Sequence, residues 1–177
     1  MIGDWRVGMK KWIAAWAAVF LLSVAIISSA EACYSATEFE AEQGVRIHSE
    51  LMVIGLTCLK MPEGRELYRK YQAFTDNNFS LIAGYETDII SYYSKEGADE
   101  PEQKFHTLRT NLANEISRRA IAMSTLGFCQ QFSPRLDTAL AMDEQKFRRW
   151  AQHAWPNQPP SEPVCDSVAL NNEGISQ

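Results

Sequence analysis

The stretch CYSATEFEAEQGVRIHSELMVIGLTC, residues 33–58, is the strongest indication of the fold class. Ser35 and Glu38 have the spacing of a capping box, in which the serine side chain accepts from a free backbone N–H and the glutamate reaches back. Apolar side chains then recur three and four residues apart, so they share one helical face. These side chains are Ile47, Leu51, Ile54 and Cys58. We expect a helix from about Ala36 to Lys60.

The rest of the chain also predicts helices, because no run alternates with period two and no Asn-Gly or Asp-Gly hairpin turn occurs. The second helix should run from about Arg65 to Lys95, since its apolar residues keep a three-four spacing throughout. This continuity favours one long helix over two. Its weak point is Asp76-Asn77-Asn78, where three poor helix formers adjoin and a kink or break could form.

A third helix is expected to start near Asp99 or Glu100 and to stop around residues 130–132. The last helical region opens at Pro134, and it is split in two if Asp143 caps a new helix. The connections are short, at roughly 3–6 residues, which makes neighbouring helices antiparallel. The sequence therefore predicts an all-α, up-down bundle of four to five helices.

The four cysteines allow three disulfide pairings. In an up-down bundle, Cys58 and Cys129 lie at one end while Cys33 and Cys165 lie at the other. The pairs Cys58–Cys129 and Cys33–Cys165 then need no long detour. No Cys-x-x-Cys occurs and all the spacings are long, which disfavours a metal or redox site built on cysteines. We predict two disulfides that clamp the two ends of the bundle.

The first 32 residues have the pattern of a secretory signal peptide. A basic head precedes an apolar run from Trp12 to Ile27, and Ala30-Glu31-Ala32 provides a small-residue cleavage site. The run is short for a membrane span, which needs roughly 20 apolar residues. The mature chain would begin at Cys33, in the periplasm or secreted, where disulfides form. Two alternatives are an uncleaved anchor and a lipid on Cys33. If the segment is a signal peptide, the chain contacts the membrane only through it and only before cleavage.

One domain is expected over residues 33–155. Residues 156–177 are rich in Pro, Asn and Ser and lack periodicity, so they are predicted to form a mostly disordered tail that a disulfide pins at Cys165. The chain has a formal net charge of −5. No basic stretch of the mature part could neutralise a phosphate backbone, which disfavours nucleic acid as a partner.

Catalytic motifs are missing from the sequence, which contains no H-E-x-x-H, G-x-S-x-G, P-loop or Rossmann glycine pattern. We therefore predict no catalytic residue, metal or cofactor. One polar group stands out, because His48 lies on the apolar stripe of the first helix at the expected level of Asn78 and Glu115. One interpretation is that these three residues form a buried layer that handles protons or binds a ligand. The favoured interpretation is a satisfied polar layer that fixes the helix register.

Two short segments, RIHSELMV at residues 46–53 and TNLANEIS at residues 110–117, resemble a group of small, secreted, all-helical proteins of alphaproteobacteria. Cys58 and Cys129 belong to the same pattern. The resemblance covers about residues 33–131 and implies a location in the cell envelope. It implies no activity, so no catalytic residue is carried over from it.

An exported domain without a catalytic motif favours a non-enzymatic module that binds another envelope component, and an apolar helical groove is the expected contact surface. The alternative function is a bundle that binds a small ligand or a metal and could act as an enzyme. That site would be centred on His48, Asn78 and Glu115.

Overall fold

The computed structural model describes residues 32–153 and 158–165. The predicted signal peptide thus lies outside the described residues except for Ala32, and so does the predicted tail apart from residues 158–165. The all-α class is confirmed for the part of the chain that the structure describes, which contains no strand, and an isolated β-bridge pairs Tyr34 with Val164. No described helix is both long enough and apolar enough to cross a bilayer.

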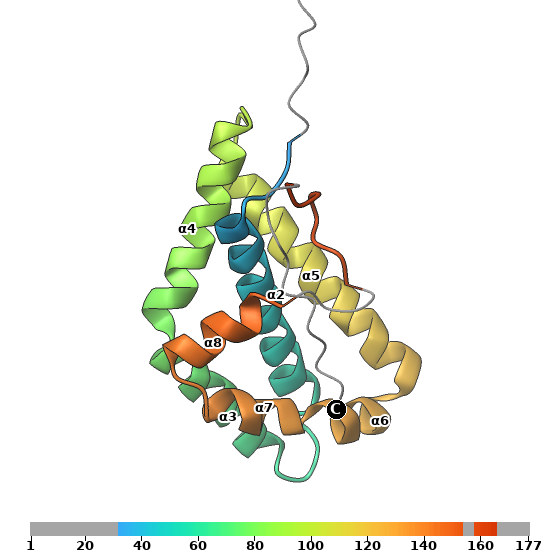
Figure 1. The fold of residues 1–177 in the computed structure, drawn as a ribbon. Helices are drawn as coiled ribbons and strands as arrows, with labels where there is room; N and C mark the ends of the chain where they lie inside the picture. The colour runs from blue at the N-terminus through green and yellow to red at the C-terminus, as the bar shows by residue number, and fades with distance from the viewer. Residues whose placement is uncertain (1–31, 154–157, 166–177) are drawn as a thin grey trace, which may run out of the picture. The chain divides into compact units, whose positions relative to one another are not determined.

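Helix α2 (Ala36–Thr57) is the centre of the fold, and α3, α4, α5 and α8 all pack on it (Figure 1). It begins at the predicted capping box, where Ser35 N–H donates to Glu38 Oε2 at 2.8 Å and Glu38 N–H donates to Ser35 Oγ at 3.4 Å. Its neighbours bury most of the helix from Phe39 to Gly55, charged residues included. Those charged side chains must therefore find partners within the protein.

The predicted second helix is two helices, α3 (Gly64–Asn77) and α4 (Phe79–Lys95), so the prediction of one long helix is wrong. The break falls at Asn78, in the predicted weak point. Both Asn78 Nδ2 and the Asn78 backbone N–H donate to the carbonyl oxygen of Phe74, at 3.0 and 3.1 Å. Side-chain bonding to the backbone competes with continuation of a helix. The two halves then pack differently, α3 on α2 and α7, and α4 on α2 and α5.

The predicted third helix is also divided, into α5 (Pro101–Met123) and α6 (Thr125–Phe132), which corrects the expectation of a continuous segment. Ser124 separates them with a φ of 68°, in the left-handed region that non-glycine residues rarely adopt. Its Oγ accepts from Gly127 N–H at 3.4 Å and caps α6. The chain can therefore turn sharply at Ser124 and bring α6 to the end of α2.

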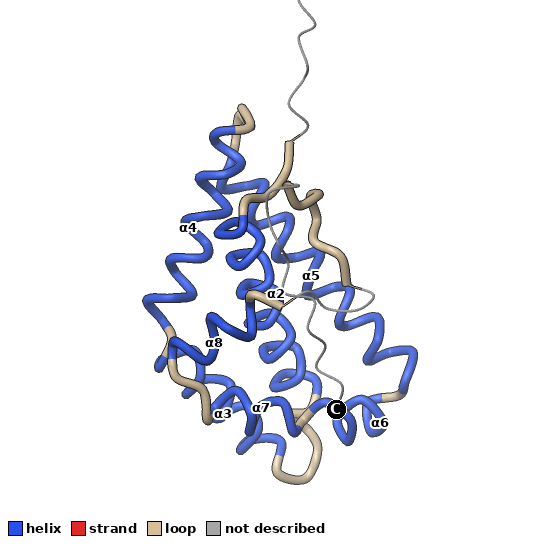
Figure 2. The backbone as a smooth tube through the Cα atoms, viewed as in Figure 1, coloured by secondary structure: helices blue, strands red, loops and turns tan. Residues whose placement is uncertain are grey.

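The last helical region is α7 (Pro134–Leu140) and α8 (Glu144–Ala151). Asp143 Oδ1 accepts from Lys146 N–H at 2.8 Å, so the predicted split at this cap is confirmed. The short helices α6 and α7 lie across the lower end of the molecule, and α8 crosses in front of α2 (Figure 2). The described part of the chain thus has seven helices, three of them short and crossing, where an up-down bundle of four to five helices was expected.

Both predicted disulfide pairings are present. Cys58–Cys129 joins the end of α2 to α6 with the Cα atoms 5.7 Å apart, and Cys33–Cys165 has its Cα atoms 5.1 Å apart. The second bridge holds residues 158–165, here named the strap. Tyr34 N–H donates to the Pro163 carbonyl at 2.7 Å, and Cys165 N–H donates to the Tyr34 carbonyl at 3.0 Å. The strap therefore lies beside the start of α2, although 119 residues separate Ser161 from Glu42 in the sequence.

Candidate functional site

His48 lies at the interface between α2 and α3, where its ring stacks on Tyr71 with 5.6 Å between centroids. Its Nε2 is 3.2 Å from Thr75 Oγ1 and 3.3 Å from the Tyr71 hydroxyl. Burial, assisted by the positive charge of Arg109, lowers the pKa of His48 to about 4, so the imidazole is neutral at pH 7.

The Thr75 hydroxyl donates its proton to the Tyr71 carbonyl oxygen, at a distance of 3.0 Å. Thr75 Oγ1 can therefore only accept from His48, and it does so when Nε2 carries the proton. In the other tautomer, Nε2 accepts from the Tyr71 hydroxyl. Either tautomer of His48 thus finds a partner on α3, and the contact joins the two helices in both cases.

Asn78 is 3 % exposed and lies at the break between α3 and α4. Its amide donates to the Phe74 carbonyl, while its Oδ1 has no hydrogen-bond partner. The side chain is therefore occupied with its own backbone, which agrees with a role in ending α3.

Glu115 extends from α5 toward a different face of α2 from His48. Its Oε2 accepts from Arg46 Nη1 at 3.3 Å, and its Oε1 accepts from Arg119 Nη2 at 3.2 Å. Its side chain is 39 % exposed. Among the described residues, no hydrogen bond or ion pair joins any two of His48, Asn78 and Glu115. His48 bonds to α3, Asn78 bonds to the backbone at the end of α3, and Glu115 bonds to Arg46 and Arg119.

A more deeply buried polar group, which the sequence reasoning missed, lies beneath the strap. Glu42 is 0 % exposed and Arg46 is 6 % exposed. Arg46 Nη2 donates to Glu42 Oε1 at 3.1 Å and to the Pro159 carbonyl at 3.1 Å. Ser161 N–H lies 3.0 Å from both carboxylate oxygens of Glu42, and Ser161 Oγ also donates to Glu42. The only local signal was the i, i+4 spacing of Glu42 and Arg46.

Tyr34 completes this group. It is fully buried, and its hydroxyl lies 3.0 Å from Ser161 Oγ. Burial and the nearby negative charge of Glu42 raise the pKa of Tyr34 far above its ordinary value, so its hydroxyl keeps its proton. We name Tyr34, Glu42 and Arg46 the strap site, because each of them bonds to residues 158–165.

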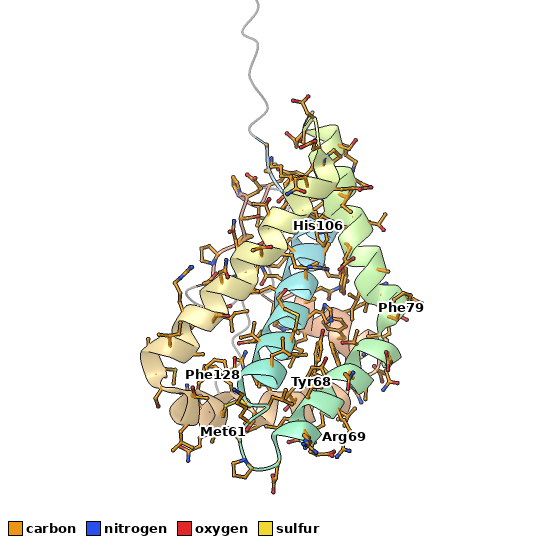
Figure 3. The ribbon with its side chains drawn as sticks, turned by 180° about the vertical axis from the view of Figure 1, so that it is seen from behind. Met61, Tyr68, Arg69, Phe79, His106 and Phe128 are labelled. Atoms are coloured by element: carbon orange, nitrogen blue, oxygen red, sulfur yellow. A yellow bond between two sulfur atoms is a disulfide. The ribbon has the colours of Figure 1, made fainter. Side chains whose placement is uncertain are left out.

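Large apolar side chains are exposed at the other end of α2, around the Cys58–Cys129 bridge. We name this group the apolar end, and its members, with exposures from 37 % to 81 %, are Leu56, Leu59, Ile121, Met123 and Leu126. Figure 3 shows this region from behind, with Met61 and Phe128 at the lower end of the molecule. Single exposed apolar residues need no explanation, but several at one end suggest a contact surface.

Basic side chains accompany the apolar end. Lys60, Arg65 and Arg118 are all exposed, and no ion pair within the described residues involves them. Within those residues there is also no group of three or more His, Cys, Asp or Glu side chains placed to hold a metal ion. Comparison with protein-family models, with curated proteins and with solved structures finds no match to this chain.

Proposed function

We propose that the protein is an exported, non-enzymatic helical module that binds another protein of the cell envelope through its apolar end. Two disulfides support export, because such bonds persist in oxidising compartments and are rare in the cytosol. The periplasm or the extracellular space is the location that fits both the bridges and the leader-like first 32 residues.

The observation that carries the proposal is the exposure of large apolar side chains at one end of the molecule. Leu126 is 53 % exposed and Leu56 is 50 % exposed, whereas Ile54, two residues from Leu56, is fully buried. The Cys58–Cys129 bridge holds the two helices that carry them in a fixed relation. A rigid apolar surface of this kind suits the apolar face of a partner helix.

The charges beside the apolar end include the exposed Glu63, but basic side chains predominate among those we assign to it. Lys60, Arg65 and Arg118 are basic and exposed, in a chain whose net charge is −5. A partner helix with acidic side chains beside its apolar face would be complementary to them. We therefore propose an acidic amphipathic helix of an envelope protein as the partner.

Site-specific photo-crosslinking in cells that make the protein tests this proposal. A photoreactive residue at Ala122, exposed at the end of α5, should form an adduct with another protein. The matched control carries the same photoreactive residue at Gly84, which is exposed on α4 with no atom within 4 Å of the place where a Cβ would lie. The control should form no adduct.

A second variant ties the adduct to the apolar end. Leu126→Glu should abolish the Ala122 adduct, since it places a charge on the contact surface. Phe79→Glu, at an even more exposed apolar residue elsewhere, should leave it intact. Equal adducts from Ala122 and Gly84, adducts with lipid only, or an adduct that survives Leu126→Glu would contradict the proposal.

A small-ligand site at His48 is a second candidate function. The observation that favours it is a half-buried, neutral imidazole beside two hydroxyl groups, those of Tyr71 and Thr75. A library of small polar fragments, screened by NMR of the protein, should then shift the His48 and Tyr71 signals before any others. Fragments that leave those two signals unmoved would rule out this site.

A further inference from the structure

The strap site holds two buried charges whose partners come largely from a distant segment. Buried ions are tolerated only when they are paired and hydrogen-bonded. Arg46 supplies one bond to Glu42, and Ser161 supplies the others through its N–H and its hydroxyl. Without the strap, Glu42 would lose its bonds to Ser161 and Arg46 would lose its bond to Pro159, which would leave both charges on a structured surface. The body of the protein is thus built to receive a peptide at this place.

The contacts follow the alternation of an extended chain. The Pro159 carbonyl, the Ser161 N–H, the Pro163 carbonyl and the Cys165 N–H all bond to the body, so every second residue of the strap is recognised through its backbone. A period of two is the repeat of an extended segment. The pairing with the backbone of Tyr34 is the mode in which peptides add to an exposed edge.

Two of the three prolines of the strap, Pro159 and Pro163, occupy positions where only a carbonyl is needed. Pro159 and Pro163 contribute acceptors, while the two donors come from Ser161 and Cys165, which have N–H groups. Prolines also keep a segment extended before it binds, which reduces the entropy lost on ordering. The site therefore selects an extended, proline-containing segment with serine at the position of Ser161.

We propose that Tyr34, Glu42 and Arg46 form a binding site for extended, proline-rich, serine-containing peptides, which the chain's own strap fills while the Cys33–Cys165 bridge is closed and which another polypeptide of that class fills when the bridge opens. The site uses residues other than those of the apolar end, so it goes beyond the proposed function and either can fail alone.

Opening the bridge requires a dithiol reductant of the envelope. One thiolate of that reductant attacks the sulfur of Cys165, the S–S bond breaks, and Cys33 leaves as a thiolate that takes up a proton. The second thiol then attacks the mixed disulfide and releases Cys165. The bridge gains two electrons and two protons, and the reductant becomes a disulfide. Cys33 and Cys165 are half-buried, whereas Cys58 is 0 % and Cys129 is 5 % exposed, so the strap bridge is the reachable one.

A peptide titration tests the site. The receptor is the chain with Cys33→Ser, Cys165→Ser and Ser161→Pro, which opens the clamp and weakens the strap by removing the Ser161 N–H and hydroxyl. The probe is a fluorescent peptide of residues 158–165 with serine at 165, QPPSEPVS. Anisotropy should show saturable binding to this receptor. Binding to the oxidised wild-type protein should be at least about tenfold weaker, because its own strap occupies the site.

The matched control peptide carries the Ser161→Pro change, and it should bind at least about tenfold more weakly than the probe, the loss expected for hydrogen bonds to a charged group. Wild-type protein whose strap bridge has been opened by a dithiol is a second receptor with no substitution, which guards against a misfolded variant. Equal binding of the two peptides, equal binding to closed and open protein, or no binding to either receptor would overturn the proposal.

Discussion

The two disulfides clamp regions that are held in different ways. Cys58–Cys129 joins two helices that already pack on each other within the core, and both of its cysteines are buried. Cys33–Cys165 holds the strap, which otherwise depends on hydrogen bonds and on the partly buried Val164. The separations in sequence, 71 and 132 residues, give nearly equal loop-closure entropies, so the surroundings of each bridge decide its effect.

Removing each bridge in turn tests that difference most strongly. The pair Cys58→Ala and Cys129→Ala should lower the free energy of unfolding by about 4 kcal/mol, because the helices cannot relax without losing their packing. The pair Cys33→Ala and Cys165→Ala should lower it clearly less, because the folded state can recover entropy when the strap comes away. Urea unfolding measures both. Equal losses would show that the strap is as integral as the core.

The packing of single side chains gives a second, smaller contrast. Leu51 on α2 is 0 % exposed, so Leu51→Ala should lower the free energy of unfolding by about 2–5 kcal/mol. Val164 of the strap is only partly buried, and Val164→Ala should lower it by less than about 1 kcal/mol. Thermal unfolding of both variants measures the two losses. A larger loss for Val164→Ala than for Leu51→Ala would show that the strap contributes more packing energy than α2.

The pH dependence of stability should arise from His48 in the helices and not from the strap. Because the pKa of His48 is lowered to about 4 in the folded state, the unfolded chain binds a proton between pH 6.5 and 4 that the folded chain does not. The free energy of unfolding should fall as the pH drops through that range, by about 2–3 kcal/mol from this residue. Urea unfolding between pH 4 and 7 measures it. His48→Gln should reduce the slope, whereas opening the strap bridge should not.

The last comparison is between two neighbouring residues on α2. Glu42 is satisfied by the strap, whereas Gln43 is 0 % exposed and neither its Nε2 nor its Oε1 has a hydrogen-bond partner. Gln43→Met keeps a similar volume and removes the unsatisfied amide, so it should raise the free energy of unfolding by about 1–2 kcal/mol. A lower free energy of unfolding for Gln43→Met, measured by thermal unfolding, would mean that the Gln43 amide makes stabilising contacts in the folded protein.

The sequence predicted those features that depend on local signals. The cap at Ser35 and Glu38, the cap at Asp143 and the weak point at Asn78 are each encoded within a few residues. The cysteine pairing also followed, because it needs only the direction of each helix. The break at Ser124 was missed, because a left-handed serine has no sequence pattern of its own.

The site could not be predicted, because its contacts depend on helix phase and on a distant segment. His48 and Arg46 are two residues apart on α2, which places them about 200° apart around the helix. Glu115 was expected beside His48 because both lie at one level, yet it bonds to Arg46 on another face. The bond from Arg46 to Pro159 spans 113 residues, and no local pattern announces such a contact.

The Cys33–Cys165 bond also makes the chain between those residues a covalent ring, with the Cys58–Cys129 bond nested inside it. A protease that nicks one loop, such as the turn between α4 and α5, therefore releases no fragment. The two cut ends stay attached through the bridges, and the packed helices hold them in register. The protein would therefore remain in one piece after a single cleavage between Cys33 and Cys165.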